Sequence, residues 1–186
     1  QNIIITNNIK ELGVETVGKE EDKEVNIKAT GETQTATIQI GAISNEEETI
    51  TNAKILGKFP TKSSTNTMDI TLTSNIKITT GQGGVKIYYS SNENATEDLE
   101  NSENGWTEDS NLADKRCYLI VVPSLNKGEK ICAEYGVDIN TTDIEDKKAE
   151  EVCKVVYNKI KMESVNAEST KVLLKGHNNI KIEMYI

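Results

Sequence analysis

Aromatic side chains, proline, histidine and arginine are all scarce in this chain of 186 residues. Aromatic residues make up 4% of the sequence, and there are 2 prolines, 1 histidine and a single arginine, Arg116. The hydrophobic core must therefore come from Ile, Val and Leu, of which the β-branched pair is typical of strands. With so few rings, a concave aromatic face for sugar binding is disfavoured.

The chain also lacks basic charge and long apolar runs. Its formal net charge of −9 argues against nucleic-acid binding, because phosphate contacts need a basic surface stripe. No apolar segment approaches the roughly 20 residues that span a bilayer, so we expect no membrane insertion. The first residue is Gln1 and no signal-peptide pattern follows it, which predicts a processed or excised segment.

The three cysteines, Cys117, Cys132 and Cys153, contain no CxxC pair, and this excludes the usual zinc sites. A turn at 126–129 predicts that segments 117–123 and 130–139 form a β-hairpin. In that register the thiols of Cys117 and Cys132 lie several residues apart, too far for a normal disulfide. We therefore expect three free thiols.

Short segments of alternating hydrophobicity recur between polar, Gly- and Asn-rich turns. They lie at 36–40, 49–60, 69–73, 85–89, 118–122, 152–160, 171–174 and 180–186. This pattern predicts an all-β fold, an antiparallel β-sandwich. We expect N-terminal strands or a linker at 1–30, the sandwich module at 31–176, and a terminal strand at 177–186 that belongs to this module or starts a following one.

One long acidic connection, residues 90–115, interrupts the strands and holds the only tryptophan. Loops of this length are often functional. Trp106 is either a ligand platform or an anchor that fixes the loop to the sandwich. Tyr89 is a second candidate ligand contact, although Tyr88 and Tyr89 alternate, so one of them must face the core.

A second polar stretch carries oxygen atoms at the spacing of a metal-binding loop. Asp138, Asn140, Asp143 and Asp146 offer the hard ligands that calcium prefers. The stretch lacks the glycine and the terminal glutamate of an EF-hand, so a solvated run of charges is the alternative. No cofactor other than calcium is predicted.

Catalytic groups are missing from the sequence pattern. His177, the single histidine, lies in a Gly-His-Asn-Asn turn with no recognisable Ser or Cys nucleophile beside it. We therefore predict that the chain is not an enzyme.

Several segments together resemble repeat domains of Gram-positive, clostridia-like cell-surface proteins. They are 49–60 with its final Phe-Pro, 85–91, the Asn-Gly-Trp-Thr at 104–107, and 127–131 with its Gly-Glu turn. The segment 171–176 resembles the end of such a module, with Lys175 where relatives have Thr. The resemblance implies an immunoglobulin-like β-sandwich module at the cell surface or cell wall.

The resemblance also implies a function, that of a non-enzymatic extracellular structural or adhesion module that spaces or presents other domains. Its partners would be neighbouring modules of the same protein and a host or cell-surface glycan or protein. The alternative is a carbohydrate- or peptide-binding β-sandwich that uses the 90–115 loop. Some modules of this kind form a Lys–Asn isopeptide crosslink; the candidates here are Lys28 and Asn158, with Asp69 as the acid.

Overall fold

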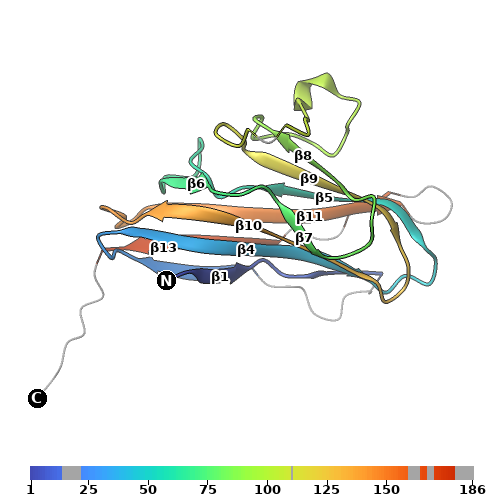
Figure 1. Cartoon of the computed structure of the whole chain (residues 1–186), viewed down its shortest axis with the longest axis horizontal. Coiled ribbons are helices and arrows are strands. Elements are labelled where there is room, and N and C mark those ends of the chain that lie inside the picture. Colours follow the sequence, from blue (N-terminus) through green and yellow to red (C-terminus); the bar gives the residue numbers. More distant parts are fainter. Residues whose placement is uncertain (14–21, 110, 159–163, 167–169, 179–186) are drawn as a thin grey trace, which may run out of the picture.

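The computed structural model describes residues 1–13, 22–109, 111–158, 164–166 and 170–178. Within these residues the chain forms two β-sheets packed face to face, with one 3-10 turn, η1 (Ser102–Asn104), and no α-helix (Figure 1). The predicted β-sandwich is therefore confirmed.

The two sheets divide the described strands between them. Sheet A contains β1 (Ile3–Thr6), β2 (Lys10–Leu12), β4 (Thr33–Ser44), β6 (Ile70–Leu72), β7 (Lys77–Thr80) and β10 (Lys130–Asn140). Sheet B contains β3 (Lys23–Lys28), β5 (Ile50–Lys58), β8 (Lys86–Ser90), β9 (Cys117–Leu125), β11 (Lys148–Asn158), β12 (Ser164–Asn166) and β13 (Thr170–His177). The order is β1-β4-β10-β6 in sheet A and β3-β13-β11-β5-β9-β8 in sheet B.

Most neighbouring strands are antiparallel, as predicted, but the first strands of the chain make both sheets mixed. β1 and β2 run parallel to β4, and β3 runs parallel to β13. The first segments of the chain thus supply an edge strand to each sheet. Ile5 and Leu12 belong to the core, so residues 3–12 are part of the sandwich and not a linker.

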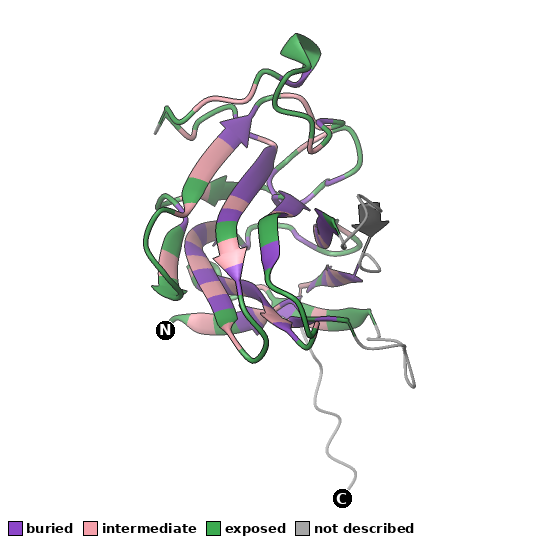
Figure 2. Cartoon of the chain, turned by 90° about the vertical axis from the view of Figure 1, so that its right-hand side faces the viewer, coloured by how far each residue is buried: buried purple, intermediate pink, exposed green. Residues whose placement is uncertain are grey.

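Alternation along the strands places the core between the sheets (Figure 2). Ile38 and Ile40 of β4 face Ile55 and Ile120 from sheet B, and all four are at most 1% exposed. Burying an isoleucine side chain of this size contributes about 1.5–3 kcal/mol. Aliphatic residues therefore provide most of the core, as the scarcity of aromatic residues predicted.

The predicted hairpin of residues 117–123 with 130–139 does not form. β9 pairs with β5 and β8 in sheet B, whereas β10 pairs with β4, β6 and β7 in sheet A. The turn after Leu125 therefore passes from one sheet to the other. β9 and β10 each pair over a longer stretch with strands other than each other. A turn sequence alone does not show whether it joins a hairpin or connects two sheets. Cys117, Cys132 and Cys153 are all free thiols.

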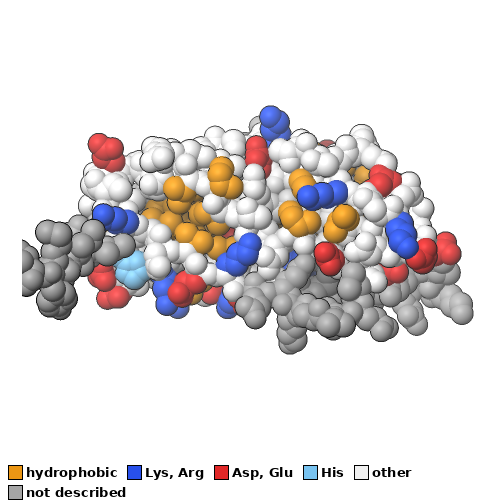
Figure 3. Space-filling model, turned by 90° about the horizontal axis from the view of Figure 1, so that it is seen from below, with side chains coloured by type: hydrophobic (Ala, Val, Ile, Leu, Met, Phe, Trp, Pro, Cys, Tyr) orange, Lys and Arg blue, Asp and Glu red, His pale blue; other side chains and the backbone are white. Residues whose placement is uncertain are grey.

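The surface is mixed in polarity, and Figure 3 shows one face on which hydrophobic side chains form small groups between charged ones. Among the described residues, the large hydrophobic side chains that are exposed are Ile4 and Leu99. No helix in this part of the chain is long and apolar enough to cross a membrane. The strand predicted at 180–186 lies outside the described residues.

Candidate functional site

A groove lies on the outer face of sheet B, and its floor is built by β5 and β11. Val152 is opposite Lys58 in the antiparallel register, and Lys154 is opposite Leu56. Because side chains alternate along a strand, these four residues point away from the core that Ile55 and Val155 fill on the other face. The floor of the groove is thus fixed by the register of two central strands.

The long connection 91–116 covers the neighbouring strand β9 and ends beside the groove. Cys117 and Leu119 are 1% and 0% exposed although they do not belong to the core between the sheets. The connection shields them from the outer side, and the backbone of Ala95 lies against the Cys117 thiol. Burial raises the pKa of this thiol to about 11. Residues 93–97 therefore form one wall of the groove, and Cys117 is not a reactive thiol.

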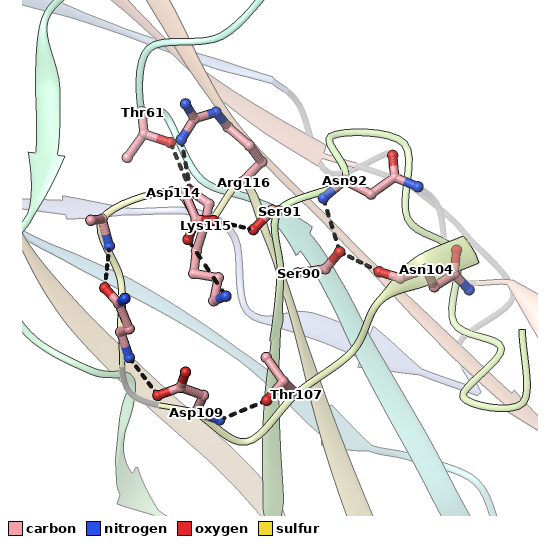
Figure 4. A network of polar contacts seen from close by, with 12 residues as sticks. Thr61, Ser90, Ser91, Asn92, Asn104, Thr107, Asp109, Asp114, Lys115 and Arg116 are labelled. Atoms are coloured by element: carbon pink, nitrogen blue, oxygen red, sulfur yellow. Dashed lines mark hydrogen bonds and ion pairs between the residues drawn. The ribbon is translucent and has the colours of Figure 1, made fainter. Parts of the chain in front are cut away.

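Polar side chains inside this connection hold it in one shape (Figure 4). Asn104, which is buried, accepts the Thr96 backbone N–H at 3.0 Å and donates to the carbonyl oxygen of Asp98 at 2.8 Å. The hydroxyl of Ser90 donates to the Asn104 carbonyl and accepts the backbone N–H of Asn92. Side-chain to backbone bonds of this kind replace the missing secondary structure.

The opposite end of the groove is closed by the loop 61–66 and the start of β11. Asn66 is buried, and its side-chain amide nitrogen donates to the Thr61 carbonyl at 2.9 Å, while its side-chain oxygen Oδ1 accepts the backbone N–H of Glu150 at 3.1 Å. The loop is therefore fixed to β11. These hydrogen bonds give the groove an ordered border at this end.

Two cavities make up the groove. One of about 430 Å³ is lined by loop 63–66, Arg116, Lys148 and Glu150, and one of about 300 Å³ by Ala95, Thr96, Glu97 and Lys154. Both cavities are lined by Lys58, Asn94 and Val152, so they adjoin each other. This size is in the range of small-ligand and peptide sites.

Two carboxylates of the groove, Glu93 and Glu150, already form hydrogen bonds or an ion pair with other residues of the protein. Glu93 accepts hydrogen bonds from the hydroxyl and the backbone N–H of Ser64, which lower its pKa below the ordinary value. The more distant cations Lys58 and Arg116 act in the same direction. Glu150 forms an ion pair with Lys171 at 3.5 Å.

A second polar cluster lies inside the sandwich, where Glu151 is 0% exposed. Its carboxylate accepts hydrogen bonds from the hydroxyls of Tyr118, at 2.6 Å, and Tyr135. Tyr118 comes from sheet B and Tyr135 from sheet A, so one carboxyl group joins both layers. Burial raises the pKa of Glu151 to about 8, although these hydrogen bonds act in the opposite direction.

The same interior region ties the first strands to the last one. Lys10 is buried and its ammonium group donates to the Thr170 hydroxyl, which in turn donates to the side-chain oxygen of Asn7 at 2.8 Å. The amide of Asn7 donates to the carbonyls of Thr170 and Glu151 at 3.3 and 3.4 Å. Buried polar groups linked in this way connect the N-terminal segment of sheet A to β13 of sheet B.

The two aromatic candidates from the sequence do not line the groove. The indole N–H of half-buried Trp106 donates to the Thr96 carbonyl at 2.8 Å, which is the contact of a loop anchor. Tyr89 is 4% exposed, its ring packs near Phe59, and its hydroxyl accepts the backbone N–H of Ile76. Of the adjacent tyrosines, Tyr89 is thus the one that faces the core.

The candidate calcium ligands are spread along the end of β10 and the following turn. Asn140 donates to Asp69 at 3.3 Å and accepts the N–H of Thr142, while Asp143 and Asp146 adopt positive φ angles of 53° and 61° in the turn. Asp138 lies within β10. Among the described residues, no three His, Cys, Asp or Glu side chains are grouped so that they hold a metal ion.

The candidate crosslink residues are not brought together. Lys28 is paired with His177 at the end of β13, whereas Asn158 ends β11 beyond the opposite end of the β11–β13 pairing. Asp69 is exposed and not the buried acid that the reaction requires. The sequence lacks the signature of crosslinking modules, and the register of β11 and β13 keeps Lys28 and Asn158 apart.

His177 has Asn26 as its side-chain partner, with His177 Nε2 at 2.8 Å from the amide oxygen. An amide oxygen is not a nucleophile, so this pair offers no catalytic arrangement of the Ser–His or Cys–His kind.

The residues that build the groove were not identified from the sequence. Lys58 and Val152 resemble any other strand residues, and they are about 90 positions apart along the chain. The single arginine, Arg116, immediately before a strongly apolar strand, was the one compositional signal that pointed to this region.

Comparisons with known proteins add little to this geometry. No protein-family model and no curated protein sequence matches the chain. Among solved structures, it is similar to the collagen-binding domain from a Staphylococcus aureus adhesin, with 14% identity and a TM-score of 0.36 over 75% of this chain and 85% of that one. Likeness of this degree is too weak to transfer a function.

Proposed function

We propose that this chain is a non-enzymatic structural and adhesion module of an extracellular bacterial surface protein, and that the groove on sheet B is its contact surface. The observation that carries the proposal is the groove itself, a hollow with a rigid two-strand floor and ordered loop walls. A preformed border of this kind costs little conformational entropy when a partner binds.

The lining of the groove also favours peptide binding over carbohydrate binding within the alternative function. Its lining offers hydroxyls, amides and charged groups, while its one aromatic residue, Phe59, is 2% exposed and belongs to the core. Sugar rings usually stack on exposed aromatic faces. An extended polypeptide therefore suits this groove better than a neutral glycan, and its wall is the 90–115 loop named in that alternative.

The test is a binding assay against immobilised extracellular-matrix proteins, with collagen included because it is named for the adhesin neighbour. The variant Val152→Trp fills the point where the two cavities meet. Val121→Trp is the matched control, since Val121 is also half-buried on sheet B and lines neither cavity. We expect at least one matrix protein to bind, and Val152→Trp alone to weaken that binding.

Two results would contradict the proposal. Absence of binding across the whole panel would remove the adhesion role, and equal binding by all three proteins would place the contact surface elsewhere. Circular dichroism of the two variants ensures that a loss of binding is not a loss of folding.

A further inference from the structure

The groove collects cations in a protein that is acidic overall. Lys58, Lys148 and Lys154 come from its floor and its end, and Arg116 lies at the edge of the 430 Å³ cavity. Among the described residues, none of these four side chains has a carboxylate oxygen within 4.0 Å. Within the part of the chain that the structure describes, the guanidinium of Arg116 donates to the neighbouring carbonyl of Lys115 at 3.2 Å and keeps further N–H donors.

The acids of the groove do not cancel this charge. The lining contains three carboxylates, Glu93, Glu97 and Glu150, against these four cations. The hydrogen bonds from Ser64 leave the charge of Glu93 in place, whereas Glu150 is paired with Lys171, which lies outside the lining. The local excess is therefore positive, although the whole chain carries −9.

The spacing of the cations follows the repeat of a strand. Outward side chains of β11 recur every second residue, about 7 Å apart, and Lys148 to Lys154 spans about 20 Å. Lys58 lies beside Val152, two residues before Lys154. Between Lys148 and Lys154 the outward positions of β11 hold Glu150, which is paired with a lysine of β13, and Val152. Alternate side chains of an extended peptide have the same repeat, so a peptide along β11 can place carboxylates two residues apart next to Lys58 and Lys154.

We propose that the groove binds an extended acidic peptide, with carboxylates two residues apart held by Lys58 with Arg116 and by Lys154. This inference rests on the proposed function and names the ligand chemistry of the same groove. Salt screens charges beyond about 8 Å at physiological ionic strength. The distant negative surface of the protein therefore repels such a peptide only weakly, while the groove cations attract it at contact distance.

The experiment is an NMR titration of ¹⁵N-labelled protein with an acetylated octapeptide of alternating Glu and Ser. We expect shifts at the backbone amides of Lys58, Asn94 and Val152, and little change in sheet A. An alternating Gln and Ser octapeptide should produce no saturable shift. A peptide with the same four glutamates placed consecutively should bind several-fold more weakly.

Charge-reversal variants locate the site. Lys58→Glu is expected to weaken binding of the Glu/Ser peptide by about tenfold or more, a loss typical of a charge-assisted contact. Lys77→Glu is the matched control, because Lys77 is an exposed lysine of sheet A with the same change in net charge. It should change the affinity less than twofold.

Each other outcome overturns the inference. Equal binding of the Gln/Ser peptide would show that binding does not depend on the carboxylates of the peptide. Unchanged binding by the Lys58→Glu variant would place the peptide elsewhere on the protein. Binding of a sulfated heparin fragment without binding of the Glu/Ser peptide would identify an anionic glycan instead. If matrix binding is lost in Val152→Trp while the Glu/Ser peptide fails to bind, the adhesion function stands and this ligand assignment falls.

Discussion

Glu151 allows a quantitative prediction, because a carboxyl group with no exposed surface must respond to pH. Its pKa rises from 4.5 to about 8, first because of burial. Each pKa unit corresponds to about 1.4 kcal/mol, so ionising Glu151 costs about 5 kcal/mol more in the folded protein than in the unfolded chain. This is a large part of the 5–15 kcal/mol that typically separates folded from unfolded domains.

The sign follows from proton binding. Between pH 4.5 and pH 8 the folded protein keeps the Glu151 proton while the unfolded chain has lost it. The free energy of unfolding therefore falls as pH rises through this window and levels off above pH 8. Tyr118 and Tyr135, which face the carboxyl group, have pKa values raised well above 10 by burial and stay protonated throughout. Lys10 is a further charged residue of this buried region, and its ammonium group donates a hydrogen bond to the Thr170 hydroxyl.

The assay is urea unfolding followed by far-UV circular dichroism at pH 5, 6, 7 and 8 and constant ionic strength. The variant Glu151→Gln carries no titrating group there, so its curve should lack this slope. Wild type should be the more stable protein at pH 5, and its advantage should shrink by about 3–4 kcal/mol by pH 8, because the full change of about 5 kcal/mol is reached only between pH values well below 4.5 and well above 8. The control Glu134→Gln, on the outward side of β10, should keep the wild-type slope.

The reasoning is refuted if wild-type stability is constant or rises from pH 5 to pH 8. Parallel curves for wild type and Glu151→Gln would refute it equally, since the pH dependence would then belong to another group.

Two further predictions concern the loops. Asn104→Ala should destabilise the connection 91–116 by about 2 kcal/mol, because Thr96 and Asp98 lose their partners; faster hydrogen exchange of the Thr96 amide would show it, and unchanged protection would contradict the anchoring role. Adding calcium to EDTA-treated protein should leave the melting temperature unchanged, since the described carboxylates form no metal-holding group. A rise of several degrees that Asp143→Asn abolishes would restore the calcium site predicted from the sequence.

The sequence predicted the fold class because alternation is a local property. In β11 every second residue from Ala149 to Val155 is buried, and the apolar residues from Val152 onward indicated a strand without any structural knowledge, whereas the polar residues before Val152 did not. Glu151 occupies one of the inward positions. Its burial was not predictable, since its partners Tyr118 and Tyr135 come from strands of two different sheets.

Pairing between distant strands was the part that local patterns could not supply. The turn sequence after Leu125 is compatible with pairing of β9 to β10 or to β5. The longer pairing is the one with β5, and this is the pairing that forms. The groove depends on the same information, because Lys58, Asn94 and Val152 meet only once the order of sheet B is known. Trp106 was recognisable as a loop residue, but its bond to Thr96 needed the loop conformation.

The parallel edge strands determine where the described chain enters and leaves the sandwich. Ile3 at the start of β1 lies opposite Ala36, and His177 at the end of β13 accepts the N–H of Ala29, only a few residues earlier in the same turn region. Both ends therefore lie at one extremity of the long axis, on the left in Figure 1. Lys175, two residues before His177, lies opposite Lys148, which lines the groove. The groove therefore reaches the same end of sheet B at which the described chain leaves the sandwich.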